Sequence, residues 1–315
     1  MKKIIILALS VFTVGLLLIQ CKDEKNNQVS DSVSESDTLV SDSAKEIQKP
    51  EEVITYSEFI FPEGKKDSVM AVFKEKYSKE ERYTILAINR LDEDNAWRAD
   101  TLMIPSKIEE DFLKYSPFPK HLDILKDINK MVFFSYPIQA YAAYENGKLV
   151  KWGPTSMGKK AAQTKTGLMF SNWKKTLAIS TVNKSWKLPY NFNIHNTLGI
   201  GWHQFDLPGY PASHSCLRLL MDDAKWMYSF GEQWVLTPDG AKVRANGTPV
   251  IVFGEYAWGQ KKPWKQLAKD HKSTEYSIED MEKEVQPFKE KILQEQSNRA
   301  QVIAEVETKK NTITP

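Results

Sequence analysis

The chain has 315 residues, and its formal net charge is only +2 at pH 7. A charge so close to zero leaves no electrostatic footprint for a nucleic acid, so we expect no such partner. The two cysteines, Cys21 and Cys216, can form at most one disulfide. Residues 53–270 are long enough for one large or two small domains.

The N-terminus has the pattern of an export signal. A basic start is followed by an almost wholly apolar run, residues 4–19, and then by Gln20-Cys21. The run is too short to be a secure membrane-spanning helix. The order of a basic start, a short apolar core and a cleavage region predicts secretion. Leu18-Ile-Gln-Cys21 resembles a lipoprotein box, which implies a signal peptide over residues 1–21 and a lipidated Cys21. An ordinary signal or an uncleaved anchor is the alternative, and either would still export the chain.

Residues 22–52 have the composition of a tether. Ser, Asp, Glu, Asn and Gln dominate, and no aromatic residue is present. Such a segment cannot bury enough apolar surface to fold, so we expect a disordered acidic linker. Lys22-Asp-Glu24 resembles the surface-export signals of some bacterial lipoproteins, although a plain tether is the alternative. We therefore expect an exported lipoprotein, held to a membrane by its N-terminal lipid and facing the periplasm or the cell surface.

Residues 54–107 have the pattern of a small α/β module. Asp67–Tyr77 spaces its apolar residues as a helix does, and Ser78-Lys-Glu-Glu81 is a helix-cap pattern before a second apolar run. Asp100–Pro105 has the pattern of a short strand. The segments 88–92 and 100–105 resemble parts of a lysin motif, which implies binding to the glycan strands of peptidoglycan. The alternative is a cap that only packs on the following domain.

Short β-type runs recur in residues 130–256 and are separated by turn signals. These runs are 131–136, 140–144, 148–152, 176–180 and 249–254. Their close spacing predicts a β-sandwich or a barrel-like core. The expected fold class is therefore mainly β with α, with the small module before this domain and a helix after it. Residues 221–230 have a helical pattern that Asp222 or Asp223 could cap.

Residues 275–307 form a charged segment with helical 3-4 spacing of apolar residues. Pro287 should break or kink the helix. Two placements remain open, a coiled-coil surface for a partner and a helix that folds back on the domain.

Cys216 is the only cysteine that remains once the N-terminus is processed. It lies in Pro211-Ala-Ser-His-Ser-Cys-Leu-Arg-Leu219, thirteen residues after His203. A lone thiol with separate histidines is typical of a nucleophile, although a free cysteine is often just a small buried apolar group. The polar neighbours and the turn-rich Pro208-Gly-Tyr-Pro211 favour a loop at an active site.

The segment from His203 to Leu219 resembles the active-site signature of the L,D-transpeptidases, a histidine, a loop and then Ser-His-Gly-Cys-x-Arg. Ser156-Met-Gly158 and Thr164-Lys-Thr-Gly167 resemble a further stretch of the family, S-x-G followed by T-P-T-G, with Lys165 in place of proline. The resemblance covers roughly residues 130–256. Ser215 departs from it, because the family has glycine there, which allows a positive φ or a close approach of substrate.

The resemblance implies that Cys216 is the nucleophile and that His203 is its general base and acid. One ring nitrogen of His203 would be oriented by the backbone carbonyl of Gln204. The backbone N–H groups of His214, Ser215 and Cys216 would form an oxyanion hole. His214 would support the loop rather than act as the base.

Further residues are expected to contact substrate or to shape the groove. Arg218, Ser213 and Tyr210 would bind substrate, Arg218 by holding a carboxylate, although an arginine that packs the loop is the alternative. His195 is interpreted as a wall of the groove and Trp202 as a core residue. No cofactor is implied, and no His/Asp/Glu spacing resembles a set of metal ligands.

The family resemblance implies acyl transfer on peptidoglycan stem peptides through a thioester, by cross-linking or by carboxypeptidase cleavage. Carbapenem-type inhibitors would then acylate Cys216. A second hypothesis is a non-catalytic peptidoglycan-binding lipoprotein with a degenerate transpeptidase fold.

Overall fold

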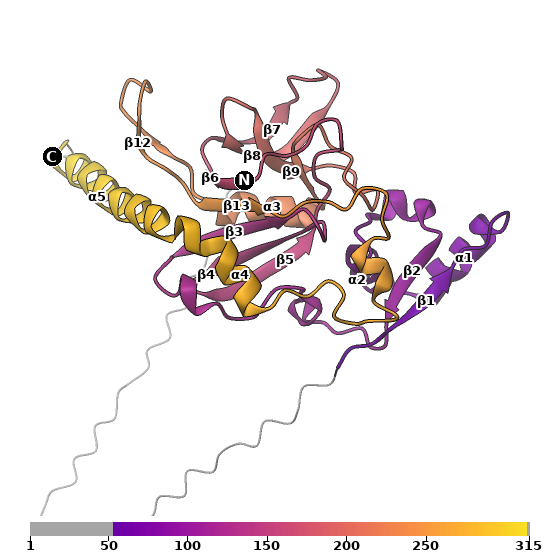
Figure 1. Cartoon of the computed structure of the whole chain (residues 1–315). Helices are drawn as coiled ribbons and strands as arrows, with labels where there is room; N and C mark the ends of the chain where they lie inside the picture. Colours follow the sequence, from indigo (N-terminus) through magenta and orange to yellow (C-terminus); the bar gives the residue numbers. More distant parts are fainter. Residues whose placement is uncertain (1–52, 314–315) are drawn as a thin grey trace, which may run out of the picture. The chain divides into compact units, whose positions relative to one another are not determined.

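The computed structural model describes residues 53–313 (Figure 1). The predicted signal peptide, Cys21 and the tether lie outside the described residues. Within residues 53–313, two sheets and five helices form the framework, together with two strand pairs and short 3-10 helices. The 3-10 helices are Glu93–Arg98, Phe112–Tyr115, Asp123–Leu125, Pro263–Gln266 and Gln286–Phe288. None of the helices in residues 53–313 combines the length and the apolar character needed to cross a membrane.

The larger sheet has five strands, in the order β5-β4-β3-β13-β6. The strands are β3 (Lys130–Ser135), β4 (Ala140–Glu145), β5 (Lys148–Pro154), β6 (Gly167–Phe170) and β13 (Pro249–Phe253). Both faces are covered, which explains the nearly continuous apolar runs in the sequence. Because side chains alternate along a strand, Met131 and Phe133 pack into one core while Val132 and Phe134 pack into another.

A second, four-stranded sheet has the order β10-β9-β8-β7. Its strands are β7 (Lys174–Ile179), β8 (Lys187–His195), β9 (Ile200–Gln204) and β10 (Leu217–Leu219). Phe192 and Trp202 from this sheet pack against Phe134 of the first one, and the Phe134 and Trp202 rings stack with centroids 6.2 Å apart. The prediction that Trp202 is a core residue is confirmed, and the two facing sheets fit the expected sandwich-like class.

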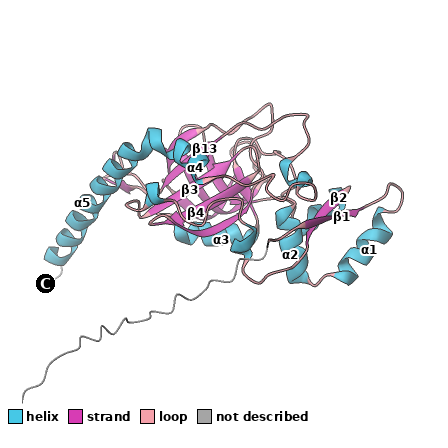
Figure 2. Cartoon of the chain, turned by 60° about the horizontal axis from the view of Figure 1, so that its bottom comes forward, coloured by secondary structure: helices cyan, strands magenta, loops and turns pink. Residues whose placement is uncertain are grey.

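Helix α3 (Met221–Phe230) and helix α4 (Ile278–Val285) cover opposite faces of the five-stranded sheet (Figure 2). The α3 residues Ala224 and Met227 pack between the sheets. The expectation that Asp222 or Asp223 caps α3 is wrong. Leu220 occupies the cap position without a side-chain bond, and Asp223 is buried in the first turn, where its carboxylate lies 3.0 Å from Lys151 Nζ.

The N-terminal module has the order strand, helix, helix, strand. It comprises β1 (Tyr56–Ile60), α1 (Lys66–Lys76), α2 (Lys79–Ile88) and β2 (Thr101–Pro105), and β1 pairs with β2 in antiparallel register. Ser78 and Glu81 form a capping box at the start of α2, as their spacing predicted. The sequence analysis did not find β1. The lysin-motif resemblance of this module stays a prediction.

The module packs on the rest of the chain through the buried Arg90. Its Nε donates to the carbonyl of Ile138 at 2.7 Å. The guanidinium carbon also lies 5.7 Å from the Trp152 ring and 5.4 Å from the Trp264 ring. A buried arginine is tolerated because carbonyls and aromatic faces replace its water shell.

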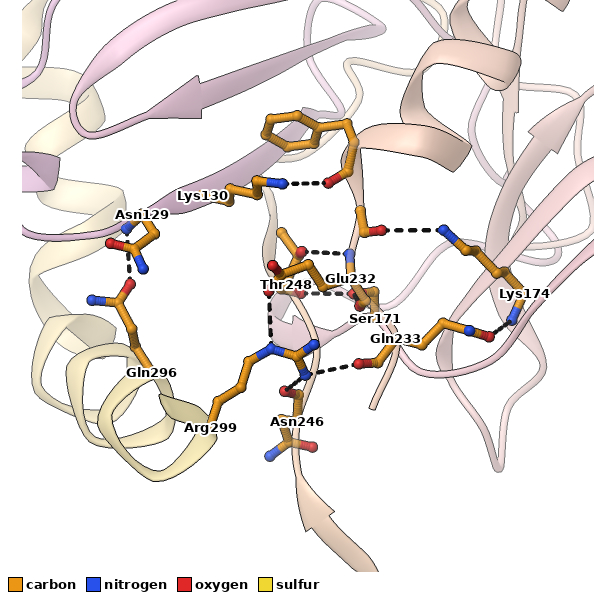
Figure 3. A network of polar contacts seen from close by, with 12 residues as sticks. Asn129, Lys130, Ser171, Lys174, Glu232, Gln233, Asn246, Thr248, Gln296 and Arg299 are labelled. Carbon is orange, nitrogen blue, oxygen red and sulfur yellow. Dashed lines mark hydrogen bonds and ion pairs between the residues drawn. The ribbon is translucent and has the colours of Figure 1, made fainter. Parts of the chain in front are cut away.

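The C-terminal segment folds back on the domain. Helix α4 ends at Val285, a 3-10 turn contains Pro287, and α5 (Lys289–Ile313) follows, so the predicted break is confirmed. Arg299 Nη1 donates to the carbonyls of Gln233 and Asn246, both at 2.8 Å, while its Nε lies 2.9 Å from the Glu232 carboxylate (Figure 3). Strands β11 (Val235–Leu236) and β12 (Val243–Ala245) form a small hairpin that contacts α5.

Candidate active site

Two neighbouring strands bring the predicted histidine and cysteine together. His203 lies on β9, and Cys216 directly precedes β10, which runs parallel to β9 with Leu217 opposite Trp202 and Arg218 opposite His203. Both side chains line one small pocket, which has a volume of about 40 Å³. The complete lining is Ser180, Val182, Trp186, Leu188, His203, Phe205, Ser213, His214, Cys216 and Arg218.

The ring of His203 is held in one tautomer. Its Nδ1 lies 2.9 Å from the backbone carbonyl of Gln204, the contact that the sequence implied. A carbonyl can only accept, so Nδ1 carries the proton and Nε2 keeps its lone pair. The pKa of His203 is lowered to about 4, mainly by burial; the bond to Gln204 opposes this shift, and the charge of Arg218 adds to it. His203 is therefore a neutral base at pH 7.

Cys216 is a free, half-buried thiol. Burial raises its pKa, and a contact with the Gly201 backbone and the charge of Arg218 oppose that rise. Its Sγ lies 3.9 Å from the carbonyl of Gly199, in the turn before β9. The thiol of Cys216, with its raised pKa, and the neutral imidazole of His203 line the same pocket. Both groups therefore rest without charge, and a thiolate would form if the proton moved to His203.

The loop before Cys216 presents unpaired backbone donors. Ser215 has φ +78°, and the N–H groups of His214, Ser215 and Cys216 have no acceptor within the described part of the chain. The loop is held by Ser213 Oγ, which donates to the Cys216 carbonyl at 2.5 Å, and by Thr164 Oγ1, which donates to the Ser215 carbonyl at 3.0 Å. Such a nest of N–H groups can bind a developing negative charge.

His214 is engaged by its own neighbours. Its Nε2 lies 2.8 Å from Lys159 Nζ, and its ring packs 5.3 Å from that of Trp186. An ammonium can only donate, so Nε2 accepts and Nδ1 carries the proton. Partial burial lowers the pKa of His214, and the charge of Lys159 adds to this. These contacts favour the predicted supporting role over that of the base.

The guanidinium group of Arg218 forms hydrogen bonds with the loop before Cys216. Its Nη1 and Nη2 donate to the carbonyls of Asp206 and Ala212, at 3.2 and 3.3 Å. The group also lies 4.6 Å from the Phe205 ring. These contacts favour the alternative in which Arg218 packs the loop, although the residue still lines the pocket. Its role in holding a carboxylate stays a prediction.

The other predicted residues lie at different distances from the pocket. Ser213 is buried beneath the loop and lines the pocket. Tyr210 is exposed and lies outside the lining, where Lys262 Nζ is 5.4 Å from its ring. Its carbonyl accepts from Ser156 Oγ at 2.8 Å. His195 ends β8 beside Lys165 and is not part of the lining.

The sequence analysis missed the pocket wall formed by the β7–β8 hairpin. This wall consists of Ser180, Val182, Trp186 and Leu188. No motif marks these residues, and only the antiparallel pairing of β7 and β8 brings them to the cysteine. Lys159 was also missed, although its position next to Ser156-Met-Gly158 was a usable signal. In residues 53–313 no group of three or more His, Cys, Asp or Glu side chains is placed to hold a metal.

The Ser215 backbone predicts a measurable strain. A non-glycine residue at this φ costs of order 1 kcal/mol, so Ser215→Gly should raise the free energy of unfolding by up to about 1 kcal/mol, partly offset by the entropy of glycine in the unfolded chain. Acylation should be retained. Ser215→Ala is the matched control, because it keeps the strain and removes only the hydroxyl. If both variants lose activity without gaining stability, the hydroxyl itself serves the reaction.

A known protein family matches the part of the chain that contains this pocket. Residues 129–252 match the family model of the L,D-transpeptidase catalytic domain, YkuD. Residues 129–252 are therefore a domain of the L,D-transpeptidase catalytic-domain family.

Similar solved structures carry related names. An L,D-transpeptidase (Yku) from Stackebrandtia nassauensis is 25% identical, with 41% of this chain and 57% of that chain covered and a TM-score of 0.34. The transpeptidase LdtMt1 in complex with imipenem is 19% identical, with 40% and 59% covered and a TM-score of 0.32. The match thus spans less than two thirds of either chain. No curated protein matches this sequence.

Proposed function

We propose that the protein is a cysteine-dependent L,D-transpeptidase that acts on peptidoglycan stem peptides through a thioester acyl-enzyme. The observation that carries the proposal is the shared pocket of Cys216 and His203, with the lone pair of His203 on Nε2 and unpaired N–H groups on the adjoining loop. These are a nucleophile, a base and an oxyanion site, the parts that acyl transfer requires.

Acylation would begin as His203 Nε2 takes the thiol proton and Cys216 Sγ attacks the carbonyl at the L-to-D junction of a stem. The carbonyl oxygen becomes an oxyanion that the free N–H groups of residues 214–216 stabilise, a contribution of about 2.7–4 kcal/mol per donor. When the tetrahedral intermediate collapses, the C–N bond breaks and His203 returns the proton to the leaving amine.

Deacylation repeats these steps in reverse order with a new nucleophile. His203 takes a proton from an incoming amine or water, which attacks the thioester carbonyl, and the Cys216 thiol is released. An amine from a second stem gives a cross-link, whereas water gives a shortened stem.

Mass spectrometry of stem tetrapeptides incubated with the protein tests the proposal. Cross-linked dimers or tripeptides that form only with active protein would support it, and their ratio separates transpeptidation from carboxypeptidase activity. Stem binding without either product would instead favour the non-catalytic peptidoglycan-binding lipoprotein.

We also propose that the protein is anchored by a lipid on Cys21 and that residues 22–52 tether the enzyme. The sequence pattern carries this proposal, since these residues lie outside the described part. A single acyl chain binds a membrane only marginally, and the multiple chains of a lipoprotein N-terminus hold it stably. Cys21→Ser protein should therefore leave the detergent phase in a partitioning assay. Cys216→Ser protein is the control and should partition like wild type; a Cys21→Ser protein that also does so contradicts the anchor.

A further inference from the structure

The segment that builds the pocket is strongly cationic. Residues 155–218 contain eight Lys or Arg and one acidic residue, Asp206, so this segment has a formal charge of +7 in a chain whose total is +2. Focused charge of one sign around a cleft attracts ligands of the opposite sign. The segment that carries Cys216 therefore favours an anionic ligand.

His195 and Lys165 form an unusual pair in the same cationic segment, outside the pocket lining. Lys165 Nζ lies 3.5 Å from His195 Nε2, while the backbone N–H of Leu198 donates to His195 Nδ1 at 3.3 Å. A neutral imidazole accepts at only one nitrogen. The direction of the Leu198 N–H is fixed by the backbone, so Nδ1 is the acceptor and Nε2 carries the proton.

Two donors consequently face each other, the Nε2–H of His195 and the ammonium of Lys165. Neither group has a carboxylate within ion-pair distance in residues 53–313. Lys165 is exposed and His195 is partly exposed, so a ligand can reach both. A carboxylate accepts only, and its two oxygens can receive one hydrogen bond from each donor.

The pair adjoins both segments that contact the proposed nucleophile. His195 begins the turn whose Gly199 carbonyl lies 3.9 Å from Cys216 Sγ. Lys165 follows Thr164, whose hydroxyl donates to the carbonyl of Ser215. The pair thus belongs to the two chain segments that also contact Cys216 and its loop. Arg218, the other candidate for this task, already donates to loop carbonyls.

We propose that Lys165 and His195 bind a free carboxylate of the donor stem peptide and so make the enzyme selective for stems that are not amidated. The inference rests on the proposed function, since it names which form of the substrate is used. Two carboxylates of the donor are candidates, that of the terminal D-Ala and that on the D-centre of diaminopimelate. Lys165 acts here as a specificity-determining residue and takes no part in proton transfer.

Binding to Cys216→Ala protein tests the inference without turnover. Calorimetric titration with three synthetic tetrapeptides, the free acid and the two singly amidated forms, should show that one amide binds roughly 5- to 50-fold more weakly than the free acid. The amide that loses affinity identifies the carboxylate. When Lys165→Met is introduced into the Cys216→Ala protein, the difference in affinity between the free acid and the amide should disappear. Lys165→Arg should keep most of that difference. The preference should also weaken as salt is raised, because the pair is exposed.

Lys175→Met is the matched control for the loss of one positive charge, since Lys175 is exposed on β7 and does not line the pocket. It should leave the preference for the free acid unchanged. Equal binding of all three peptides, or an unchanged preference in the Lys165→Met protein, would overturn the inference. Wild-type protein that turns over amidated and free stems equally well would refute this inference alone, whereas a wild type without any turnover or adduct would refute the proposed function.

Discussion

Cys216→Ala protein is expected to form neither cross-linked nor shortened stem peptides and no covalent adduct with a carbapenem. Cys216 is the only cysteine in the described part of the chain. The neighbouring hydroxyls of Ser213 and Ser215 donate to the carbonyls of Cys216 and His214, so neither is a replacement nucleophile. Removal of the nucleophile costs on the order of 10⁶ in kcat in another acyl-transfer enzyme, and we expect a loss below the limit of detection.

Binding of the stem peptide should survive this substitution, because the side chain is small and its hydrogen bond to Gly199 is long. An unchanged melting temperature and retained binding would show that the loss is chemical. Product formation at the wild-type rate by the Cys216→Ala protein would rule out the assignment of the nucleophile.

His203→Ala protein is expected to lose about 10²–10⁴-fold in the rate of acylation, the usual contribution of a general acid–base group. The Nδ1 bond to Gln204 aims the free Nε2 lone pair, and no other histidine in the described chain lines the pocket with an available lone pair. Stopped-flow measurement of carbapenem acylation gives the rate, and calorimetry gives the binding. The affinity for stem peptide should change little.

His214→Ala and His195→Ala are the comparison variants. His195→Ala should weaken binding of free-acid stems but leave the acylation rate of bound substrate nearly unchanged. A larger loss of acylation in either variant than in His203→Ala would show that the wrong histidine was chosen as the base.

The pKa of His203 makes the same assignment testable by pH. Because burial lowers that pKa from 6.5 to about 4, Nε2 stays unprotonated throughout the range from pH 7 to 5. The acid limb of kcat/KM should therefore have its midpoint near pH 4 and not near 6.5, with activity lost as pH falls through it. A midpoint near 6.5 would indicate an exposed imidazole as the base.

Much of the fold could be predicted because its elements have strong local patterns. The runs at 131–136 and 140–144 became β3 and β4, and residues 221–230 became α3 with the predicted bounds. Strand β1 was missed because none of the residues Tyr56–Ile60 is buried, so its sequence lacks a clear alternation. The cap of α3 was misassigned because Asp223 turns inward to Lys151, and that partner is distant in sequence.

The site residues that lie in one short sequence motif could be predicted. The residues that only the fold brings together were harder to predict. Cys216, His203 and the Gln204 carbonyl are linked by neighbouring strands β9 and β10, and their motif was visible. The pocket wall of the β7–β8 hairpin and the Lys165–His195 pair depend on hairpins and turns that meet only in three dimensions. The only sequence signal for a positive φ at Ser215 was that the family has glycine at this position. In the structure, this φ is +78°.

Peptide-level mass spectrometry of the trapped acyl-enzyme tests the central claim most directly. Full-length protein is incubated with a carbapenem, quenched and digested, and the peptide that spans residues 211–219 is sequenced. The account predicts one acyl group per chain, attached to Cys216 and absent from the Cys216→Ala protein. An unmodified Cys216 after full exposure, or an acyl group on another residue, would contradict it.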